Sequence, residues 1–131
     1  MEFGTKTTIK GAPAIVGSHS GGNIIQQVMV NGVSDLKPGH VVVIEDGVIT
    51  GRWDGSPLVS AQDDGAGNIT VTQVALGIAT AKQFDGDNSV STLRVGTYIR
   101  DRVVLADDSA ISASNEFTLS LSHLFSEGAW L

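Results

Sequence analysis

Residues 40–53 read HVVVIEDGVITGRW, and this stretch decides the fold class of the chain. Two runs rich in β-branched residues, Val41–Ile44 and Val48–Thr50, flank the pair Asp46-Gly47. An Asp-Gly pair between two such runs is the strongest short-range signal for a hairpin with a type I′ turn. The stretch therefore predicts two antiparallel strands joined by a two-residue turn.

The chain on both sides of this hairpin also divides into short β-prone runs. Turn pairs such as Asn31-Gly32 and Pro38-Gly39 separate the runs, and 54–67 is expected to be a loop. Further strands are expected at 23–30, 68–72, 73–81 with a break at Gly77, 90–94 and 95–100, and residues 102–105 end the regular β region. Turn signals at about every 8–12 residues favour a small barrel or clip-like sheet over βαβ units. We therefore expect a mainly β fold with little helix.

The segment near the C-terminus supports two interpretations. Residues 117–121 alternate apolar and polar side chains with the period of a strand, and Ser and Thr are weak helix formers. Ser114 or Asn115 could instead cap a helix that begins there. We expect a strand at 116–121, followed by a turn or short helix to 127–128.

Residues 1–24 are expected to form a flexible N-terminal arm. They are rich in Gly, Ser and Thr and hold few apolar side chains, so the segment cannot offset its own ordering entropy. Part of it is nevertheless β-prone, which suits pairing with an exposed sheet edge on a partner. These candidate binding residues are Thr5, Lys6, Thr7, Thr8, Ile9 and Lys10. A frayed terminus is the alternative interpretation, and residues 17–22 are expected to act as a hinge.

Residues 25–131 are expected to form one β-rich domain, since a chain of 131 residues suits a single compact core. The absence of cysteine excludes disulfides, thiolate metal sites and cysteine nucleophiles. The net charge of −6 divides into +1 on residues 1–24 and −7 on the rest. Because an acidic body repels phosphate backbones, we expect no nucleic-acid partner. No apolar run approaches the ~20 residues of a membrane span, so neither a membrane partner nor a signal peptide is expected.

No pattern in the sequence predicts catalysis, a metal site or a cofactor. His19, His40 and His123 lie far apart, whereas metal ligands usually cluster at short spacing. The stretch 17–21 has histidine where a nucleophile elbow needs serine. Residues 85–89 begin like a calcium loop, but glycine stands where that loop needs its bidentate glutamate.

Four short segments carry a further signal. They are Val43–Ile49 around the hairpin turn, Arg52–Gly55 with Trp-Asp-Gly, Ala75–Ala81 with small residues and Gly-Ile, and Val95–Asp101 with Gly-Thr and an aromatic residue. In their order and spacing they resemble segments of the head decoration proteins of lambdoid bacteriophages, a family that stabilises capsids. The resemblance covers about half of the chain, between residues 38 and 105, with a weaker match at 117–122.

This resemblance implies a small domain of the kind called β-clip or β-tulip. It also implies a homotrimer on the outer surface of the expanded capsid in the virion, after synthesis in the host cytoplasm. The partner would be the major capsid protein, to whose sheet the N-terminal arm adds a strand. No reaction, cofactor or small-molecule substrate is implied. The region between residues 54 and 75 is longer than the family pattern, and the tail 124–131 extends past its usual end.

Aromatic residues are enriched at subunit interfaces, so Trp53, Tyr98 and Trp130 are candidates for the trimer interface, although each also suits a core. Two other functions remain as alternatives. One is another structural or adhesive β module of a virion, such as a fibre or tail domain, which a coiled-coil or collagen-like repeat would favour. The other is a small hydrolase that uses His40 or His19 with a serine and an aspartate brought together by folding.

Overall fold

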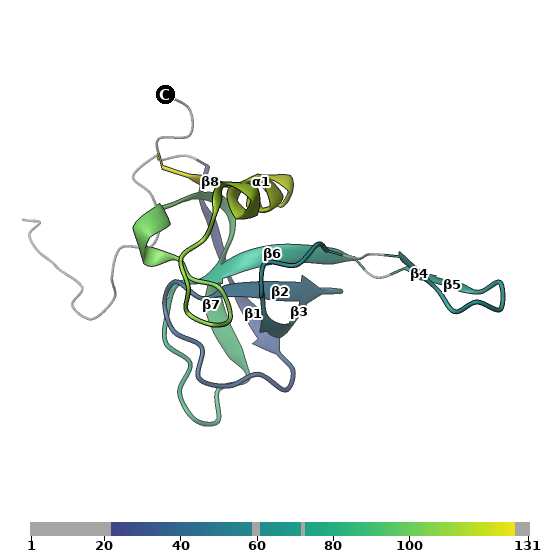
Figure 1. Cartoon of the computed structure of the whole chain (residues 1–131). Helices are drawn as coiled ribbons and strands as arrows, with labels where there is room; N and C mark the ends of the chain where they lie inside the picture. Colours follow the sequence, from purple (N-terminus) through teal and green to yellow (C-terminus); the bar gives the residue numbers. More distant parts are fainter. Residues whose placement is uncertain (1–21, 59–60, 72, 128–131) are drawn as a thin grey trace, which may run out of the picture.

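The structure of the chain is a computed structural model, and it describes residues 22–58, 61–71 and 73–127. Strands dominate its regular structure, and the expected mainly β fold with little helix is confirmed in the form of a small β-barrel-like domain (Figure 1). Its elements are β1 (Ile24–Val30), β2 (Val41–Glu45), β3 (Val48–Arg52), β4 (Ala61–Asp63), β5 (Ile69–Val71), β6 (Val74–Ala79), β7 (Ser89–Tyr98), the 3-10 helix η1 (Arg100–Arg102), α1 (Ala113–Leu121) and β8 (Leu124–Ser126).

The hairpin of β2 and β3 has the turn that the sequence predicts. Glu45 pairs with Val48, which leaves Asp46 and Gly47 as the two turn residues. Their φ angles are 50° and 85°. A type I′ turn requires positive φ at both central positions, so this part of the prediction is confirmed.

Five strands close into a barrel in the order β1-β3-β2-β6-β7, because β1 also pairs with β7. β1 runs parallel to β3 and antiparallel to β7. β8 adds to the far end of β7, where it pairs in parallel with Gly96–Tyr98. The long strand β7 therefore connects the barrel to the C-terminal part of the described chain.

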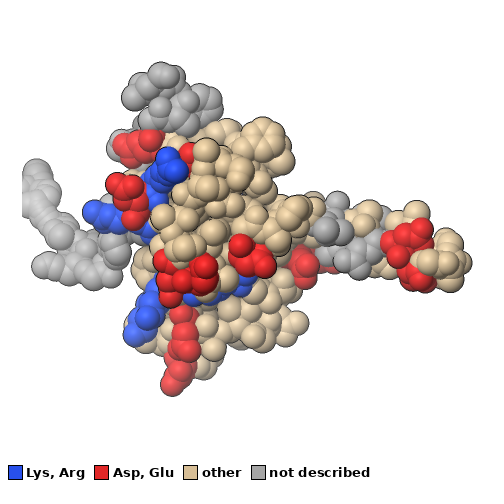
Figure 2. Space-filling view, viewed as in Figure 1, with Lys and Arg blue, Asp and Glu red and all other residues tan. Residues whose placement is uncertain are grey.

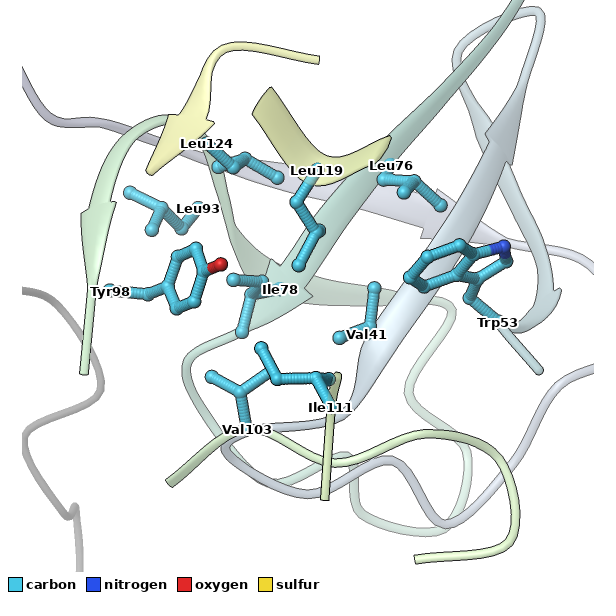
Figure 3. Close-up of a cluster of buried hydrophobic side chains, with 10 residues drawn as sticks. All are labelled: Val41, Trp53, Leu76, Ile78, Leu93, Tyr98, Val103, Ile111, Leu119 and Leu124. Carbon is cyan, nitrogen blue, oxygen red and sulfur yellow. The ribbon is translucent and has the colours of Figure 1, made fainter. Parts of the chain in front are cut away.

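The run Val41–Ile44 is apolar at every position because both of its faces are buried. Val42 and Ile44 belong to a core cluster contributed by β1, β2, β3, β7 and the β1–β2 connection, namely Val28, Leu36, Val42, Ile44, Ile49 and Val90. Val41 belongs to a second core cluster on the outer face of β2, β6 and β7, covered by α1 and β8 (Figure 3). The second cluster comprises Val41, Trp53, Leu76, Ile78, Leu93, Tyr98, Val103, Ile111, Leu119 and Leu124. Each such side chain contributes roughly 1.5–3 kcal/mol when fully buried.

Residues 113–121 form a helix, so the expected strand at 116–121 is wrong. Ser112 caps this helix, since its Oγ accepts a 3.2 Å hydrogen bond from Asn115 N. Asn115 Oδ1 in turn accepts a 2.8 Å bond from Ser112 N. This reciprocal capping box satisfies N–H groups that a helix start leaves unpaired. Capping and the burial of Leu119 therefore outweigh the period-two pattern and the weak helix propensity of Ser and Thr.

Other boundaries also differ from expectation. β6 runs through Gly77 without a break, because a Cβ there would lie 2.7 Å from Thr92 Cγ2 and 2.9 Å from Ile44 Cδ1, and glycine permits this close packing. β7 is one strand of ten residues where two strands were expected. Residues 124–126 form β8 where a turn or short helix was expected.

Candidate interaction surfaces

Connections between strands meet around a polar hollow of about 650 Å³ on the surface of the barrel. The chain segments around it are the β1–β2 connection, the β6–β7 connection, the last residue of β3 and the loop before α1. The lining residues are Asp35, Lys37, His40, Arg52, Lys82 and Asp108. Three cationic side chains thus accompany two carboxylates, which makes the hollow locally positive in a chain of net charge −6.

The turn formed by residues 37–40 places His40 at the wall of this hollow. His40 N donates a 3.1 Å hydrogen bond to Lys37 O, and Gly39 has a φ of 96°, as a type II turn requires. Lys37 N donates to His40 Nδ1 at 3.2 Å, so the neutral imidazole carries its proton on Nε2. Burial, assisted by the charge of Arg52, lowers the pKa of His40. His40 is therefore a neutral hydrogen-bond donor at pH 7.

Arg52 holds Asp108 in place at the same hollow. Arg52 Nη2 donates to Asp108 Oδ1 at 2.8 Å and to Leu105 O at 2.7 Å. The guanidinium holds the pKa of the Asp108 carboxyl below its usual range. His40 Nε2 lies 4.0 Å from Asp108 Oδ1, which is too long for a direct hydrogen bond. The positive charge of Arg52 is thus balanced within the chain.

The hollow presents hydrogen-bond donors that suit an anionic group. Its lining includes no serine, so within the described part of the chain a Ser-His-Asp arrangement is not assembled at His40. His19, the other histidine considered, lies outside the described residues. Among residues 22–58, 61–71 and 73–127, no group of three or more His, Asp or Glu side chains is placed to hold a metal ion. Ammonium and imidazole N–H groups are donors that favour carboxylate acceptors.

Helix α1 presents two large apolar side chains to solvent. Phe117 and Leu121 are 67% and 65% exposed, and their i, i+4 spacing makes them neighbours on the outer face. Asn115 and Leu119 lie on the inner face and are buried. Figure 2 shows that the surface around α1 and toward the β4–β5 hairpin is largely free of charged side chains. This face is a candidate contact surface.

Strands β4 and β5 form a hairpin that projects far from the barrel (Figure 1). It lies between residues 54 and 75, and β4 lies where only a loop was expected. Every side chain from Asp63 to Thr70 is exposed, including Ile69 at 66%. An isolated two-stranded hairpin is at best marginally stable in water, so this one is a candidate contact element.

The first described residues of the chain lie at one end of β7. Ile24 pairs with Val95, and Asn23 Oδ1 accepts a 2.9 Å hydrogen bond from Thr97 N. β8 pairs with the same end of β7, at Gly96–Tyr98. The start of β1 and the last described strand therefore lie at the same end of β7 (Figure 1).

The structure places Trp53 and Tyr98 in the second core cluster, which corrects their assignment to a trimer interface. Both side chains are enclosed by their own chain, and Trp53 Nε1 donates a 2.8 Å hydrogen bond to Ser56 O (Figure 3). Large rings supply much of the apolar burial that a small domain needs. Trp130 and the arm residues Thr5–Lys10 lie outside the described residues.

The hollow and the outer face of α1 were missed from the sequence for different reasons. The residues of the hollow are scattered along the chain and meet only through folding. The α1 face has a sequence signal, the i, i+4 pair of Phe117 and Leu121, but it was outweighed by the alternating pattern.

Comparisons with protein-family models, with curated proteins and with solved structures found no match to this chain. In the described part of the chain, no helix has the length and apolar character needed to cross a membrane. A function therefore has to be argued from the residues and surfaces of the chain itself.

Proposed function

We propose that this protein decorates the head of a lambdoid bacteriophage and stabilises it against the pressure of packaged DNA. It binds as a homotrimer to the outer surface of the expanded capsid, and its partner there is the major capsid protein. The arm of residues 1–24 adds to a sheet of the shell through Thr5–Lys10. The role is binding, with no reaction catalysed.

The observation that carries the proposal is where the four family-like segments lie in the barrel. Val43–Ile49 forms the β2–β3 turn, and Ala75–Ala81 contains most of β6, which pairs with β2. Val95–Asp101 forms the end of β7, and Arg52–Gly55 leaves the hairpin with the buried Trp53. Segments far apart in the chain thus fall in adjoining strands of the barrel. Such a placement is expected of a shared fold and supports the resemblance.

The attachment of the arm gives a second, independent support. The start of β1 and the strand β8 lie at the same end of β7, so the first and last described strands meet on one side of the domain. A strand added from this side would bind through main-chain hydrogen bonds, which need no matching side chains on the shell. This arrangement suits an arm that attaches a fixed domain to a surface.

Deletion of residues 1–17 tests the proposal. The truncated protein is expected to remain a folded trimer by light scattering, because both core clusters lie in the described barrel. It is expected to lose co-sedimentation with expanded capsids, which the full chain retains. Undiminished capsid binding would contradict the role of the arm, and a stable monomer at micromolar concentration would contradict the trimer.

Proline substitutions separate strand addition from any other role of the arm. Successive N–H groups point to opposite edges of a strand, so either Thr7→Pro or Thr8→Pro must remove a hydrogen bond of an added strand. Thr7→Val and Thr8→Val are matched controls that keep the N–H and favour a strand. One proline variant is expected to lose capsid binding while both valine variants keep it. Equal binding by all four would mean that the arm does not act as a strand.

A further inference from the structure

We propose that the β4–β5 hairpin of one copy docks in the polar hollow of a second copy, with Asp63 and Asp64 facing Lys37 and Lys82. The inference deepens the proposed trimer by naming a contact within it. It depends on the proposed trimer only for the number of copies in the assembly.

The hairpin has the features of a docking element. Its described side chains from Asp63 to Thr70 are all exposed, so the barrel of its own chain does not cover them. Asp63 pairs across the hairpin with Ile69, which places a carboxylate and a large exposed apolar side chain beside each other. Two strands without a covering surface are marginal in water, and docking would supply that surface.

The acidic tip is held ready to bind. Gly65 N donates to Asp63 Oδ1 at 2.9 Å, and Ala66 N donates to Asp64 Oδ1 at 2.7 Å. Asn68 Nδ2 donates to Asp64 Oδ2 at 2.9 Å. An ionised carboxyl group accepts about four hydrogen bonds, so both aspartates keep acceptor sites for a partner. The tip is thus preorganised, which reduces the entropy lost on docking.

The hollow offers the complementary chemistry. Among the described residues, no carboxylate lies within 4.0 Å of the ammonium groups of Lys37 and Lys82, whereas Arg52 is already paired. His40 adds a neutral N–H donor at the wall. The side chain of Phe84, 62% exposed, lies with its ring 5.2 Å from Lys82 Nζ.

On the body, the ammonium group of Lys82 lies beside the exposed ring of Phe84. On the hairpin, the carboxylate of Asp63 lies beside the exposed side chain of Ile69, so the two surfaces are complementary. Exposed ion pairs contribute little affinity by themselves, but they orient two surfaces and exclude wrong arrangements. Burial of Ile69 against Phe84 would supply apolar contact. Charge and apolar surface thus favour the same occupant, which is a second copy of this chain.

The arrangement in space makes the contact intermolecular. The hairpin extends to one side of the barrel, while the β1–β2 and β6–β7 connections lie at the opposite side, at the lower left in Figure 1. A hairpin therefore cannot reach the hollow of its own chain. A contact between two different patches repeats from copy to copy, and it closes into a ring when the rotation allows.

Charge reversal with a reciprocal swap tests the contact by sedimentation velocity of the purified full chain over a range of concentrations. Asp63→Lys and Lys82→Glu are each expected to raise the dissociation constant of the assembly at least ~tenfold, because like charges then face each other. The double variant is expected to recover most of the loss. Asp101→Lys is the matched control, since Asp101 is also an exposed acid and the charge change is the same.

Circular dichroism confirms that each variant is folded before its assembly is measured. Single variants that assemble like the wild type, a double variant that does not recover, or a wild type that stays monomeric would each overturn the contact. Capsid co-sedimentation of the same samples separates this inference from the proposed function. Wild-type assemblies that do not bind capsids would contradict the proposed function but not the contact between copies. An Asp63→Lys variant that assembles like the wild type and binds capsids would contradict the contact but not the proposed function.

Discussion

Asn23 packs directly against the bare Cα of Gly96 where the N-terminal segment joins the barrel. Asn23 Oδ1 accepts a 2.9 Å hydrogen bond from Thr97 N, and Asn23 Cα lies 2.8 Å from the place where a Cβ on Gly96 would stand. Gly96 also has a φ of +136°, a conformation that L side chains rarely adopt. Glycine is therefore required at this position, and the close packing fixes Asn23 against β7.

Gly96→Ala is expected to lower the free energy of unfolding by roughly 2–3 kcal/mol, because it adds both backbone strain and a steric clash. Urea unfolding followed by circular dichroism measures the change. Gly51→Ala is the matched control, since nothing lies within 4 Å of a Cβ there. The control is expected to stay within about 0.5 kcal/mol of the wild type. Equal losses in the two variants would contradict the requirement for glycine beside Asn23.

Tyr98 carries a buried hydroxyl group without a hydrogen-bond partner among the described residues. Figure 3 shows this hydroxyl pointing into the second core cluster. Tyr98→Phe removes the unsatisfied oxygen and keeps the ring, so the free energy of unfolding at neutral pH is expected to stay equal or rise by about 1 kcal/mol. A loss of stability in Tyr98→Phe would contradict this account of the hydroxyl.

The same variant has an expected signature in alkaline solution. Burial raises the pKa of Tyr98 above its ordinary value of 10.0, and the Glu116 carboxylate adds to the shift. Above pH 10.0 the phenol ionises in the unfolded chain while it remains neutral in the folded one, so the folded state loses stability as the pH rises. Thermal denaturation should therefore show a steeper alkaline loss for the wild type than for Tyr98→Phe. Parallel profiles would argue against a buried phenol.

His40 is expected to make the fold sensitive to mild acid. Burial and the charge of Arg52 lower its pKa from the ordinary value of 6.5, so the unfolded chain takes up this proton at a higher pH than the folded one. The contribution of neutral His40 to the free energy of unfolding is fully present above pH 6.5 and is lost as the pH falls through the pKa of the folded state. His40→Gln retains an acceptor for Lys37 N but does not titrate. Urea unfolding of both proteins between about pH 8 and 5 should show this fall in the free energy of unfolding only in the wild type.

Local signals allowed the hairpin at residues 40–53 to be predicted, because a two-residue turn and its flanking strands are set by neighbours in the chain. The positive φ angles of Asp46 and Gly47 are a direct result of that local chemistry. The parallel pairing of β1 with β3 and of β7 with β8 has no comparable signal. These pairs join segments distant in sequence, and only the packing of the whole barrel sets their register.

The candidate surfaces were harder to predict than the fold. Arg52 and Asp108 meet through a 2.8 Å hydrogen bond although they are 56 positions apart. The sequence suits the aromatic residues Trp53 and Tyr98 to an interface as well as to a core, and only the packing of the fold shows that the second core cluster takes their volume. In residues 61–63 no β-branched side chain marks a strand, so β4 was not expected there.

The most informative local error concerns Leu119 and Leu121. A strand at 116–121 would place both leucines on one face, since strand side chains alternate. In helix α1 they point in nearly opposite directions, and Leu119 is 0% exposed while Leu121 is 65% exposed. Identical substitutions at the two positions therefore distinguish a helix from a strand.

Leu119→Ala is expected to lower the free energy of unfolding by about 2–5 kcal/mol, because it leaves a cavity in the second core cluster. Leu121→Ala is expected to change it by no more than about 0.5 kcal/mol, because the side chain already lies in solvent and alanine favours a helix. Chemical unfolding of the two variants at the same protein concentration measures the difference. Equal, large losses would indicate that both leucines lie on one buried face, as in the strand that the alternation of residues 116–121 favours.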